Sequence, residues 1–418
     1  MNAFLPADIL MPKTDHMEKW AVIACDQFTS DQAYWDRVRK NAEGAVSTIN
    51  LILPEAELGT EKEAEHTAEI NATMKKYMED GVFTVYPNSF VYVERTLENG
   101  SIREGLVGMV DLDAYDYTPG ATSAIRATER TVPERIPPRQ RVRRDAPIEL
   151  PHVLMLCDDH DKKLIEPIAA KKDSLKKIYD FDLMEDGGHI TGWLVEGKDV
   201  DAFNQALTAY TATVGEKYTG LKGTPMVFAV GDGNHSLATA KSCYEELKKN
   251  NPGVDLSNHP ARYALVELEN IHDPAQVFEP IHRVLFGVDH EKFMEEFKKF
   301  YPNTHEGKGE GHVIEVCWNG HDDFVTVPDP KVQLAVGTLQ TFIDEYLKQF
   351  GGEVDYIHGD EVTRELGSKE GNMGFLLPAM GKEQLFKTVM ADGVLPRKTF
   401  SMGEARDKRY YLEARRIR

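Results

Sequence analysis

The residues of this sequence that most suggest chemistry form the run Gly231-Asp232-Gly233-Asn234-His235. An apolar stretch at residues 225–230 precedes it and predicts a short strand, and an amphipathic pattern at residues 235–250 follows it and predicts a helix. Glycine permits a sharp turn, and the first amides of a helix are unpaired and partly positive. We therefore predict that this turn binds a phosphate or carboxylate. Asp232 is a candidate base or metal ligand, and His235 is expected to titrate near neutral pH.

A purely structural interpretation of the same turn stays open, in which Asp232 or Asn234 only caps the helix. The run is not a dinucleotide-binding fingerprint, because Ser236 stands where the third glycine would be. The sequence also has no Gly-x4-Gly-Lys-Ser/Thr phosphate loop, Gly-x-Ser-x-Gly elbow, His-Glu-x-x-His motif or protein-kinase signature set. A nucleotide at this turn would have to be bound by a less common device.

A second candidate is the segment from Arg126 to Arg144, which contains seven arginines and no lysine. The planar guanidinium binds carboxylates and phosphates through two hydrogen bonds, so Arg126 and Arg130 are candidate anion ligands. The alternative is a solvated, proline-rich loop whose arginines pair with Glu129, Glu134 and other acids, and this alternative is favoured for the second half of the segment.

Two weaker candidates lie later in the chain. His282-Arg283 falls in a predicted strand and is either an anion contact or a satisfied histidine beside a salt-bridging arginine. Lys398, in Pro396-Arg397-Lys398-Thr399-Phe400, is either an anion contact or part of an ordinary turn.

The composition limits the class of partner. The formal net charge of -20 argues against nucleic acid and anionic membranes, since both need a cationic surface. The four cysteines are far apart, which favours buried thiols in a reducing compartment over disulfides or a zinc site. Neither a signal peptide nor an apolar stretch of about 20 residues is found, so a cytoplasmic location is expected.

The order of predicted elements indicates a mixed α/β (α+β) protein with mixed sheets and helices packed on them. Hairpins are predicted across Asn99-Gly100 and across residues 186–188. Further strands are predicted at residues 152–157, 263–269 and 280–286, and helices at residues 32–42, 63–80, 162–177, 200–214, 291–300 and 339–349. The length of 418 residues favours two domains, which we place at residues 1–289 and 290–418, with a last segment that could return to the first domain.

The chain resembles the prokaryotic family known as domain of unknown function 1015. Four family motifs are matched in the same order along the chain. Residues 125–131 resemble Ile-Lys-Arg-His-Glu-x-Thr, and residues 225–236 resemble an apolar strand that leads into Ala-Asp-Gly-His-His-Arg. Residues 273–283 resemble Asp-Pro followed by a Thr-His-Arg strand, and residues 395–400 resemble Met-Pro-x-Lys-Ser-Thr-x-Phe. Three positions depart from these motifs, with Thr128 and Asn234 in place of histidines and Ser236 in place of an arginine. The resemblance therefore implies a divergent branch.

The residues that the resemblance retains are Glu129, Asp232, His235 and Lys398. The Asp-Gly-His-His-Arg motif is also similar to the signature of the ParB/sulfiredoxin superfamily, which implies a core of that type and phosphate binding at this turn. From this resemblance we expect a small-molecule phosphotransferase or nucleotide hydrolase. Asp232, His235 and Glu129 would be catalytic, and Gly231, Gly233, Asn234, Arg126, Arg130, His282, Arg283 and Lys398 would bind a purine nucleotide with Mg²⁺.

Two other functions stay open. One is a non-catalytic module that holds a nucleotide or another small anionic metabolite, and the other is an acidic scaffold protein. The sequence does not decide the oligomeric state.

Overall fold

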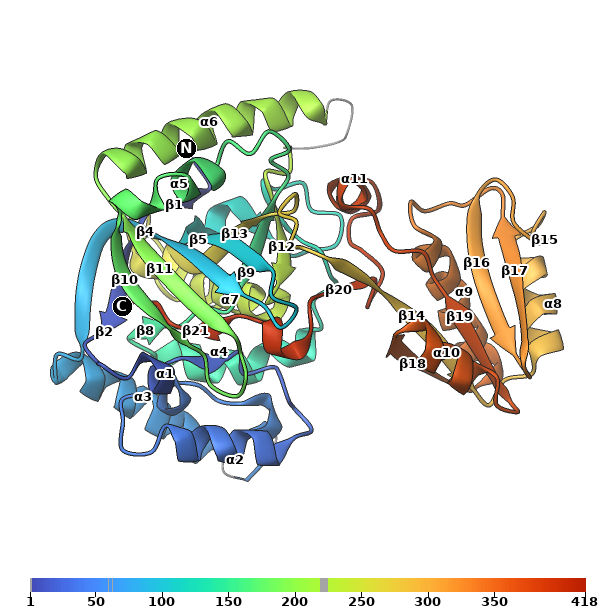
Figure 1. Ribbon diagram of the computed structural model, residues 1–418, viewed down its shortest axis with the longest axis horizontal. Helices are drawn as coiled ribbons and strands as arrows, with labels where there is room; N and C mark the ends of the chain where they lie inside the picture. The colour runs from blue at the N-terminus through green and yellow to red at the C-terminus, as the bar shows by residue number, and fades with distance from the viewer. Residues whose placement is uncertain (1, 59, 62, 219–224) are drawn as a thin grey trace. The chain divides into compact units, whose positions relative to one another are not determined.

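The protein divides into two compact units in a computed structural model that describes residues 2–58, 60–61, 63–218 and 225–418 (Figure 1). The first unit comprises Met1–Gln276 and Gly403–Arg418, and the second comprises Val277–Met402. The boundary predicted after residue 289 differs from this division for two reasons. Among the described residues, strand β14 (Phe278–Phe286) pairs with strands of the second unit, and the C-terminal segment returns to the sheet of the first.

A mixed sheet forms the framework of the first unit. Within the described residues it has thirteen strands. The main path is β6 (Tyr115–Asp116), β7 (Ile125–Ala127), β12 (Phe228–Asp232), β9 (Leu154–Cys157), β13 (Tyr263–Asn270), β5 (Ile102–Asp111), β4 (Phe83–Thr96), β2 (Ala7–Pro12), β22 (Ala414–Arg416) and β8 (Ile148–Glu149). Also joined are β1 (Phe4–Leu5), β11 (His189–Val195) and β10 (Lys176–Asp182), while β3 (Val22–Ile23) and β21 (Tyr410–Tyr411) form a separate pair.

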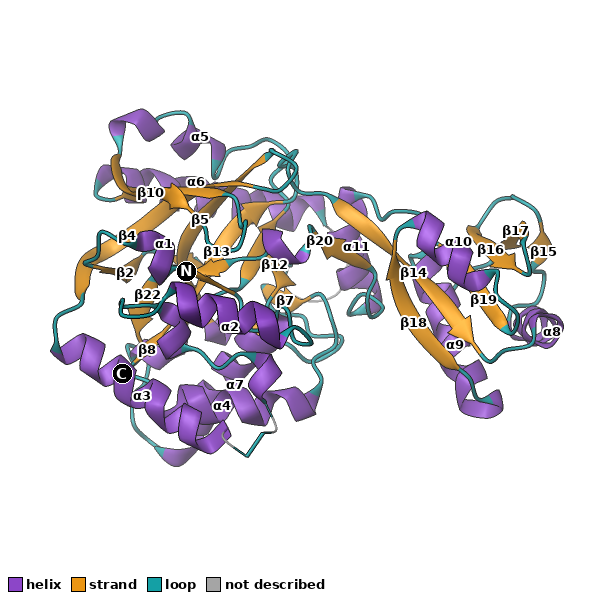
Figure 2. Ribbon diagram, turned by 60° about the horizontal axis from the view of Figure 1, so that its bottom comes forward, coloured by secondary structure: helices purple, strands orange, loops and turns teal. Residues whose placement is uncertain are grey.

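Helices cover both faces of this sheet (Figure 2). Helices α5 (Glu166–Ala169) and α6 (Lys198–Lys217) lie on one side, and α3 (Glu63–Glu79), α4 (Ile136–Asp145) and α7 (Asn234–Asn250) lie on the other. Phe203 of α6 packs edge-on against Phe90, with ring centroids 4.9 Å apart. Each aromatic side chain buried in this way contributes about 2–3 kcal/mol. The remaining helices are α1 (Met17–Trp20) and α2 (Gln32–Asn41).

Buried ion pairs fix the C-terminal segment to this unit. Arg409 forms ion pairs with Glu267 and Glu413, and Arg415 Nη2 lies 2.7 Å from Glu149 Oε1. All five side chains are buried. Because an unpaired buried charge costs about 3–5 kcal/mol, these pairs specify where the last strand inserts between β2 and β8.

The second unit is an antiparallel sheet with helices. Its order is β15 (His305–Glu306), β17 (His321–Val327), β16 (His312–Trp318), β19 (Asn372–Leu376), β14 and β18 (Glu353–His358), with β20 (Phe400–Met402) on β14. Its helices are α8 (His290–Phe300), α9 (Ala335–Phe350), α10 (Asp360–Gly367) and α11 (Lys382–Asp392). Phe293 packs against Phe342 and Phe375, with ring centroids 5.0 and 5.2 Å away, so α8, α9 and β19 share one aromatic core.

The structure confirms the mixed α+β class, both hairpins and most of the helices. The helix predicted at residues 162–177 is wrong. Asp159 Oδ2 accepts from the amides of Lys163 and Leu164, at 2.6 and 2.8 Å, which holds the chain in a turn. The short α5 and a 3-10 helix at Lys172–Ser174 follow, and from Lys176 the chain pairs with β11.

The second half of the arginine-rich segment is also not a loop. Residues 136–145 form α4, with prolines in its first turn, where a missing amide hydrogen costs nothing. In the described parts of the chain, no helix is long and apolar enough to cross a membrane.

Candidate functional site

The predicted strand–turn–helix is present in the first unit. β12 ends at Asp232 and α7 begins at Asn234, with Gly233 between them at φ 79° and ψ 26°. A Cβ at Gly233 would lie 3.0 Å from the Cα of Val153, on the approach to the neighbouring β9. Positive φ and this contact together favour glycine, so the turn depends on this residue.

The first turn of α7 has unused amides. Asp232 Oδ1 accepts from the amide of Gly233 at 2.9 Å, which stabilises the turn, but in the described structure neither Asp232 nor Asn234 caps α7 with its side chain, so the structural interpretation is wrong on this point. Over the residues that the structure describes, the amides of Asn234, His235 and Ser236 form no hydrogen bond. Three N–H groups at a helix N-terminus therefore stay available for an acceptor, and the helix dipole adds partial positive charge there.

Asn234 has a structural role. Its side chain is buried, its Oδ1 accepts from the amide of Thr128 at 3.2 Å, and its Nδ2 lies 3.3 Å from Thr128 Oγ1. Thr128 Oγ1 in turn donates to the carbonyl of Val230 at 2.5 Å. The two residues that depart from the family histidines thus bind each other and fix the segment after β7 to the end of β12.

His235 differs from the prediction in its protonation. Burial and the positive charges of Arg135 and Arg139 lower the pKa of His235 to about 4, so the expected titration near neutral pH is wrong. The amide of Val132 donates to His235 Nε2 at 3.1 Å. In the neutral ring the hydrogen is therefore on Nδ1, and His235 offers one N–H donor rather than a positive charge.

The other predicted residues of the first unit lie on β7 and the segment after it. Arg126 is buried, its Nε donates to the carbonyl of Ser123 at 2.9 Å, and burial lowers its pKa. Glu129 is half-buried, and Arg130 is exposed. Lys408, which sequence reasoning missed, places its Nζ 3.5 Å from Asp232 Oδ2. It adds a cation beside the turn from the returning C-terminal segment.

The arginines of α4 and the turn before it are already paired. Arg135 and Arg139 pair with Glu55, Arg141 with Glu63, Arg143 with Glu149 and Arg144 with Glu246. The prediction that acids pair with this part of the segment is correct, and the acids of these pairs come from other elements of the first unit.

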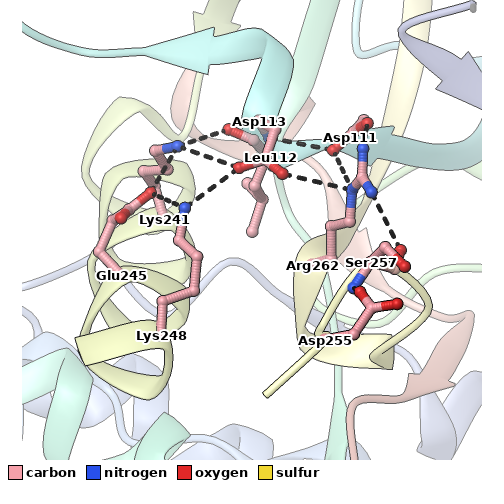
Figure 3. Close-up of polar contacts among 9 residues, drawn as sticks. All are labelled: Asp111, Leu112, Asp113, Lys241, Glu245, Lys248, Asp255, Ser257 and Arg262. Atoms are coloured by element: carbon pink, nitrogen blue, oxygen red, sulfur yellow. Dashed lines mark hydrogen bonds and ion pairs between the residues drawn. The ribbon is translucent and has the colours of Figure 1, made fainter. Parts of the chain in front are cut away.

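Contacts on the side of α7 hold the helix in place, and Figure 3 shows them. Lys241 Nζ donates to the carbonyl of Leu112 at 2.9 Å, and Lys248 Nζ lies 3.2 Å from Asp113 Oδ1. Arg262 binds the carboxylate of Asp111 through two nitrogens, at 2.9 and 2.6 Å. Each such pair is worth little; the two lysines attach α7 to the segment after β5, and the Arg262–Asp111 pair joins the two segments beside the helix.

Comparison with known proteins places the chain in a family. The model described as "Protein of unknown function (DUF1015)" matches residues 5–352. The chain belongs to this family. No curated protein matches.

Several solved structures are similar at low identity. A free serine kinase variant in complex with AMP has a TM-score of 0.39 and 13% identity, and the match covers 74% of this chain and 91% of that one. SbnI with a C-terminal truncation, from Staphylococcus aureus, has a TM-score of 0.37, 11% identity and coverages of 71% and 83%. A conserved hypothetical protein from Pyrococcus furiosus has a TM-score of 0.34, 14% identity and coverages of 73% and 90%.

Three predicted residues of this DUF1015 protein belong to the second unit. His282 Nε2 lies 2.8 Å from Asp360 Oδ1, and its Nδ1 accepts from the amide of Leu377 at 3.1 Å. Arg283 is fully buried and donates to Gln340 Oε1 at 3.1 Å and to the carbonyls of Ile281 and Arg397. The interpretation of His282 as a satisfied core histidine is supported, while Arg283 binds carbonyl oxygens rather than a carboxylate.

Lys398 is exposed, with φ at 54°. Its part in anion binding stays a prediction.

Sequence reasoning missed a buried cluster beside the turn. His152 Nε2 lies 3.0 Å from Ser236 Oγ, and Tyr411 OH lies 2.9 Å from His152 Nδ1. The amide of Cys25 donates to Tyr411 OH at 3.2 Å, and Asp26 Oδ2 is 3.8 Å from His152 Nε2. These residues come from four distant segments, so no local pattern could have joined them.

The described side chains do not form a cluster of metal ligands. Among the residues described, no group of three or more His, Cys, Asp or Glu side chains is placed to hold a metal ion. Mg²⁺ commonly uses one or two carboxylates together with substrate phosphates, and Asp232 would fit that role.

Proposed function

We propose that the turn around Gly233 binds the phosphate of a small anionic ligand, and that the protein transfers or hydrolyses a phosphoryl group there. The observation that carries this proposal is the first turn of α7, whose amides at Asn234, His235 and Ser236 have no partner in the described structure. A helix N-terminus with unused amides favours a phosphate oxygen. The Nδ1–H of His235 adds a fourth neutral donor.

The charges near the turn support an anion over a neutral ligand. Lys408 lies next to Asp232, and Arg135 and Arg139 are close enough to His235 to lower its pKa. Arg130 on the preceding segment is exposed and could reach a phosphate. Because Lys408 pairs with Asp232, and Arg135 and Arg139 pair with Glu55, the exposed Arg130 is the cation that favours an anion at this turn.

In the proposed reaction an acceptor oxygen attacks the terminal phosphorus while the bond from phosphorus to the leaving phosphate oxygen breaks. Asp232, or Glu129, accepts the proton of the acceptor hydroxyl or water. The α7 amides and His235 bind the oxygens of the group in transit, and Lys408 offsets negative charge beside Asp232. Lys398, His282 and Arg283 are not assigned a step.

A purine nucleotide with Mg²⁺ is the donor that we propose, and a core of the ParB/sulfiredoxin type is part of the same hypothesis. The metal would be held by Asp232 and the phosphate oxygens and would neutralise charge on them.

A non-catalytic module is the second candidate. Asp232 already accepts the Gly233 amide and pairs with Lys408, and a His235 with a pKa of about 4 is a weak base at neutral pH. Such a site would hold an anionic metabolite without moving a proton.

The test uses the purified full chain with ADP or ATP, Mg²⁺ and a panel of small hydroxyl compounds, followed by ³¹P NMR and thermal unfolding. We expect turnover that Asp232→Asn lowers by at least about 100-fold. Asp255→Asn, which changes an exposed turn aspartate, is the matched control. Nucleotide-dependent stabilisation without product would favour the module. Neither stabilisation nor product would exclude both.

A further inference from the structure

The buried cluster at His152 forms a directed chain of hydrogen bonds. The amide of Cys25 donates to the Tyr411 hydroxyl oxygen, so the Tyr411 hydrogen is directed to a different acceptor. The Cys25 thiol and His152 Nδ1, 2.9 Å away, both lie beside this hydroxyl, and the hydrogen goes to Nδ1 because a sulfur is the weaker acceptor. Burial raises the pKa of Tyr411, which keeps this hydrogen in place.

This chain fixes the tautomer of His152. Because Nδ1 accepts, the ring hydrogen of neutral His152 is on Nε2 and is donated to Ser236 Oγ at 3.0 Å. The hydroxyl hydrogen of Ser236 then has no acceptor among the described residues. Ser236 is therefore presented as a donor.

The direction of this hydrogen-bond chain also excludes Ser236 and His152 as the nucleophile and base of a serine hydrolase. A serine nucleophile needs a histidine nitrogen that accepts its proton, but Nε2 of His152 already carries a hydrogen. Asp26 lies on the Nε2 side of the ring, at 3.8 Å, rather than on Nδ1, where a triad carboxylate would orient it. The arrangement is suited to binding a ligand rather than to nucleophilic attack.

Ser236, His152, Tyr411 and Cys25 line one part of a cavity of about 150 Å³ within the first unit. The rest of the lining is mostly aliphatic and comes from the helices and loops around α3, α4 and α7: Leu51, Ile52, Met74, Val142, Leu237 and Ala240. A cavity of about this volume lined by apolar side chains accommodates a molecule the size of benzene. The cavity thus has a mostly apolar lining and one hydrogen-bond donor, the Ser236 hydroxyl, which is held in place by His152.

The charges near the Ser236 hydroxyl determine which polar group of a ligand is favoured there. The two arginines of the lining, Arg139 and Arg143, are each paired with a glutamate that also lines it. A carboxylate would therefore lose its water in this mostly apolar cavity without gaining an ion pair from either lining arginine. A neutral carbonyl oxygen would accept from Ser236 without this cost.

We propose that this cavity is a binding site for a small, neutral, mostly apolar carbonyl compound, whose oxygen accepts from the Ser236 hydroxyl while its body fills the aliphatic pocket. This site is separate from the anion site at the Gly233 turn. It does not depend on phosphate binding there, because it uses the Ser236 side chain rather than the α7 amides.

The test compares three probes of similar shape on the full chain by calorimetric titration: acetophenone, ethylbenzene and benzoate. Acetophenone and ethylbenzene differ mainly by one oxygen, so a hydrogen bond to Ser236 should make the Kd of acetophenone about tenfold lower. Benzoate should bind more weakly than acetophenone. In Ser236→Ala the advantage of acetophenone over ethylbenzene should disappear.

Two further variants complete the experiment. Ser242→Ala removes another hydroxyl from α7, one that accepts from Gln140 at 2.8 Å, and it should keep the tenfold preference. Ala240→Leu should fill the cavity and weaken both neutral probes; if it does not fold, Ser236→Ala decides alone. Equal affinities of acetophenone and ethylbenzene, no acetophenone binding at millimolar concentration, tighter binding of benzoate or an unchanged preference in Ser236→Ala would overturn the proposal.

Discussion

Two histidines, the half-buried His235 in the first unit and the buried His282 in the second, differ in the partner of one ring nitrogen. Burial lowers the pKa of each, and each accepts a backbone amide, from Val132 and Leu377 respectively. The other nitrogen of His282 is bonded to Asp360. The other nitrogen of His235 has no partner in the described part of the chain. A fully satisfied histidine stabilises its unit, whereas a half-satisfied one keeps a donor for a ligand.

The neighbouring arginines repeat this difference. Arg283 is fully buried and donates to three oxygens of its own unit, while Arg130 is exposed near the Gly233 turn. The second unit therefore uses its His-Arg pair to hold its sheet and helices together, and the first unit leaves comparable groups available. Chemical type alone does not separate these two uses.

The largest expected effect is on Arg283. Arg283→Met would leave Gln340 Oε1 and the carbonyls of Ile281 and Arg397 without their donor and should destabilise the second unit by about 4 kcal/mol. Arg130→Met should change stability by less than about 0.5 kcal/mol. Denaturant-dependent hydrogen exchange, read separately on amides of each unit, measures both. If Arg283→Met lowered the free energy of unfolding of the second unit by less than about 1 kcal/mol, the proposed difference between Arg283 and Arg130 would be contradicted.

His235 should make stability depend on pH. Its folded pKa of about 4 lies below the usual value of 6.5, so between these values the unfolded chain binds more protons. The free energy of unfolding should therefore fall as pH drops from about 6.5 to about 4, by about 3 kcal/mol. His235→Gln keeps an acceptor for Val132 and should lack this part of the decline. Parallel pH profiles for the two proteins would show that His235 is not held neutral.

Gly233 tests the turn itself. Gly233→Ala introduces positive-φ strain and a Cβ 3.0 Å from Val153 Cα, whereas Gly253→Ala, just after the other end of α7, introduces the strain at φ 81° with no atom within 4 Å. Gly233→Ala should cost about 2 kcal/mol more than Gly253→Ala and should abolish stabilisation by phosphate. Equal costs in urea unfolding would mean that the close approach to Val153 is not tight.

The smallest effect is expected at Lys398, which is exposed in the second unit. Lys398→Ala should leave the free energy of unfolding within about 0.5 kcal/mol of the wild type. Phosphate titrations of this variant then report only on its predicted role as an anion ligand. A change in unfolding free energy above about 1 kcal/mol would instead assign Lys398 to the packing of its unit.

The amino-acid sequence by itself determined the local elements. The hairpin at Asn99-Gly100 and the helix after Gly233 depend on turn chemistry and hydrophobic period within a few residues, and both are present. The helix predicted at residues 162–177 failed because Asp159 caps a turn and β11 offers a pairing partner, and long-range pairing overrides local propensity.

Only the tertiary structure decided which of these elements meet. The motif around Asp232 was visible in the sequence, but Lys408, Tyr411 and His152 come to it from segments far away in the chain. It also decided that His235 is neutral and that Arg283 belongs to a core, because burial and hydrogen-bond partners set both properties. A residue's type specifies what it can donate or accept; the fold decides whether that capacity is already used.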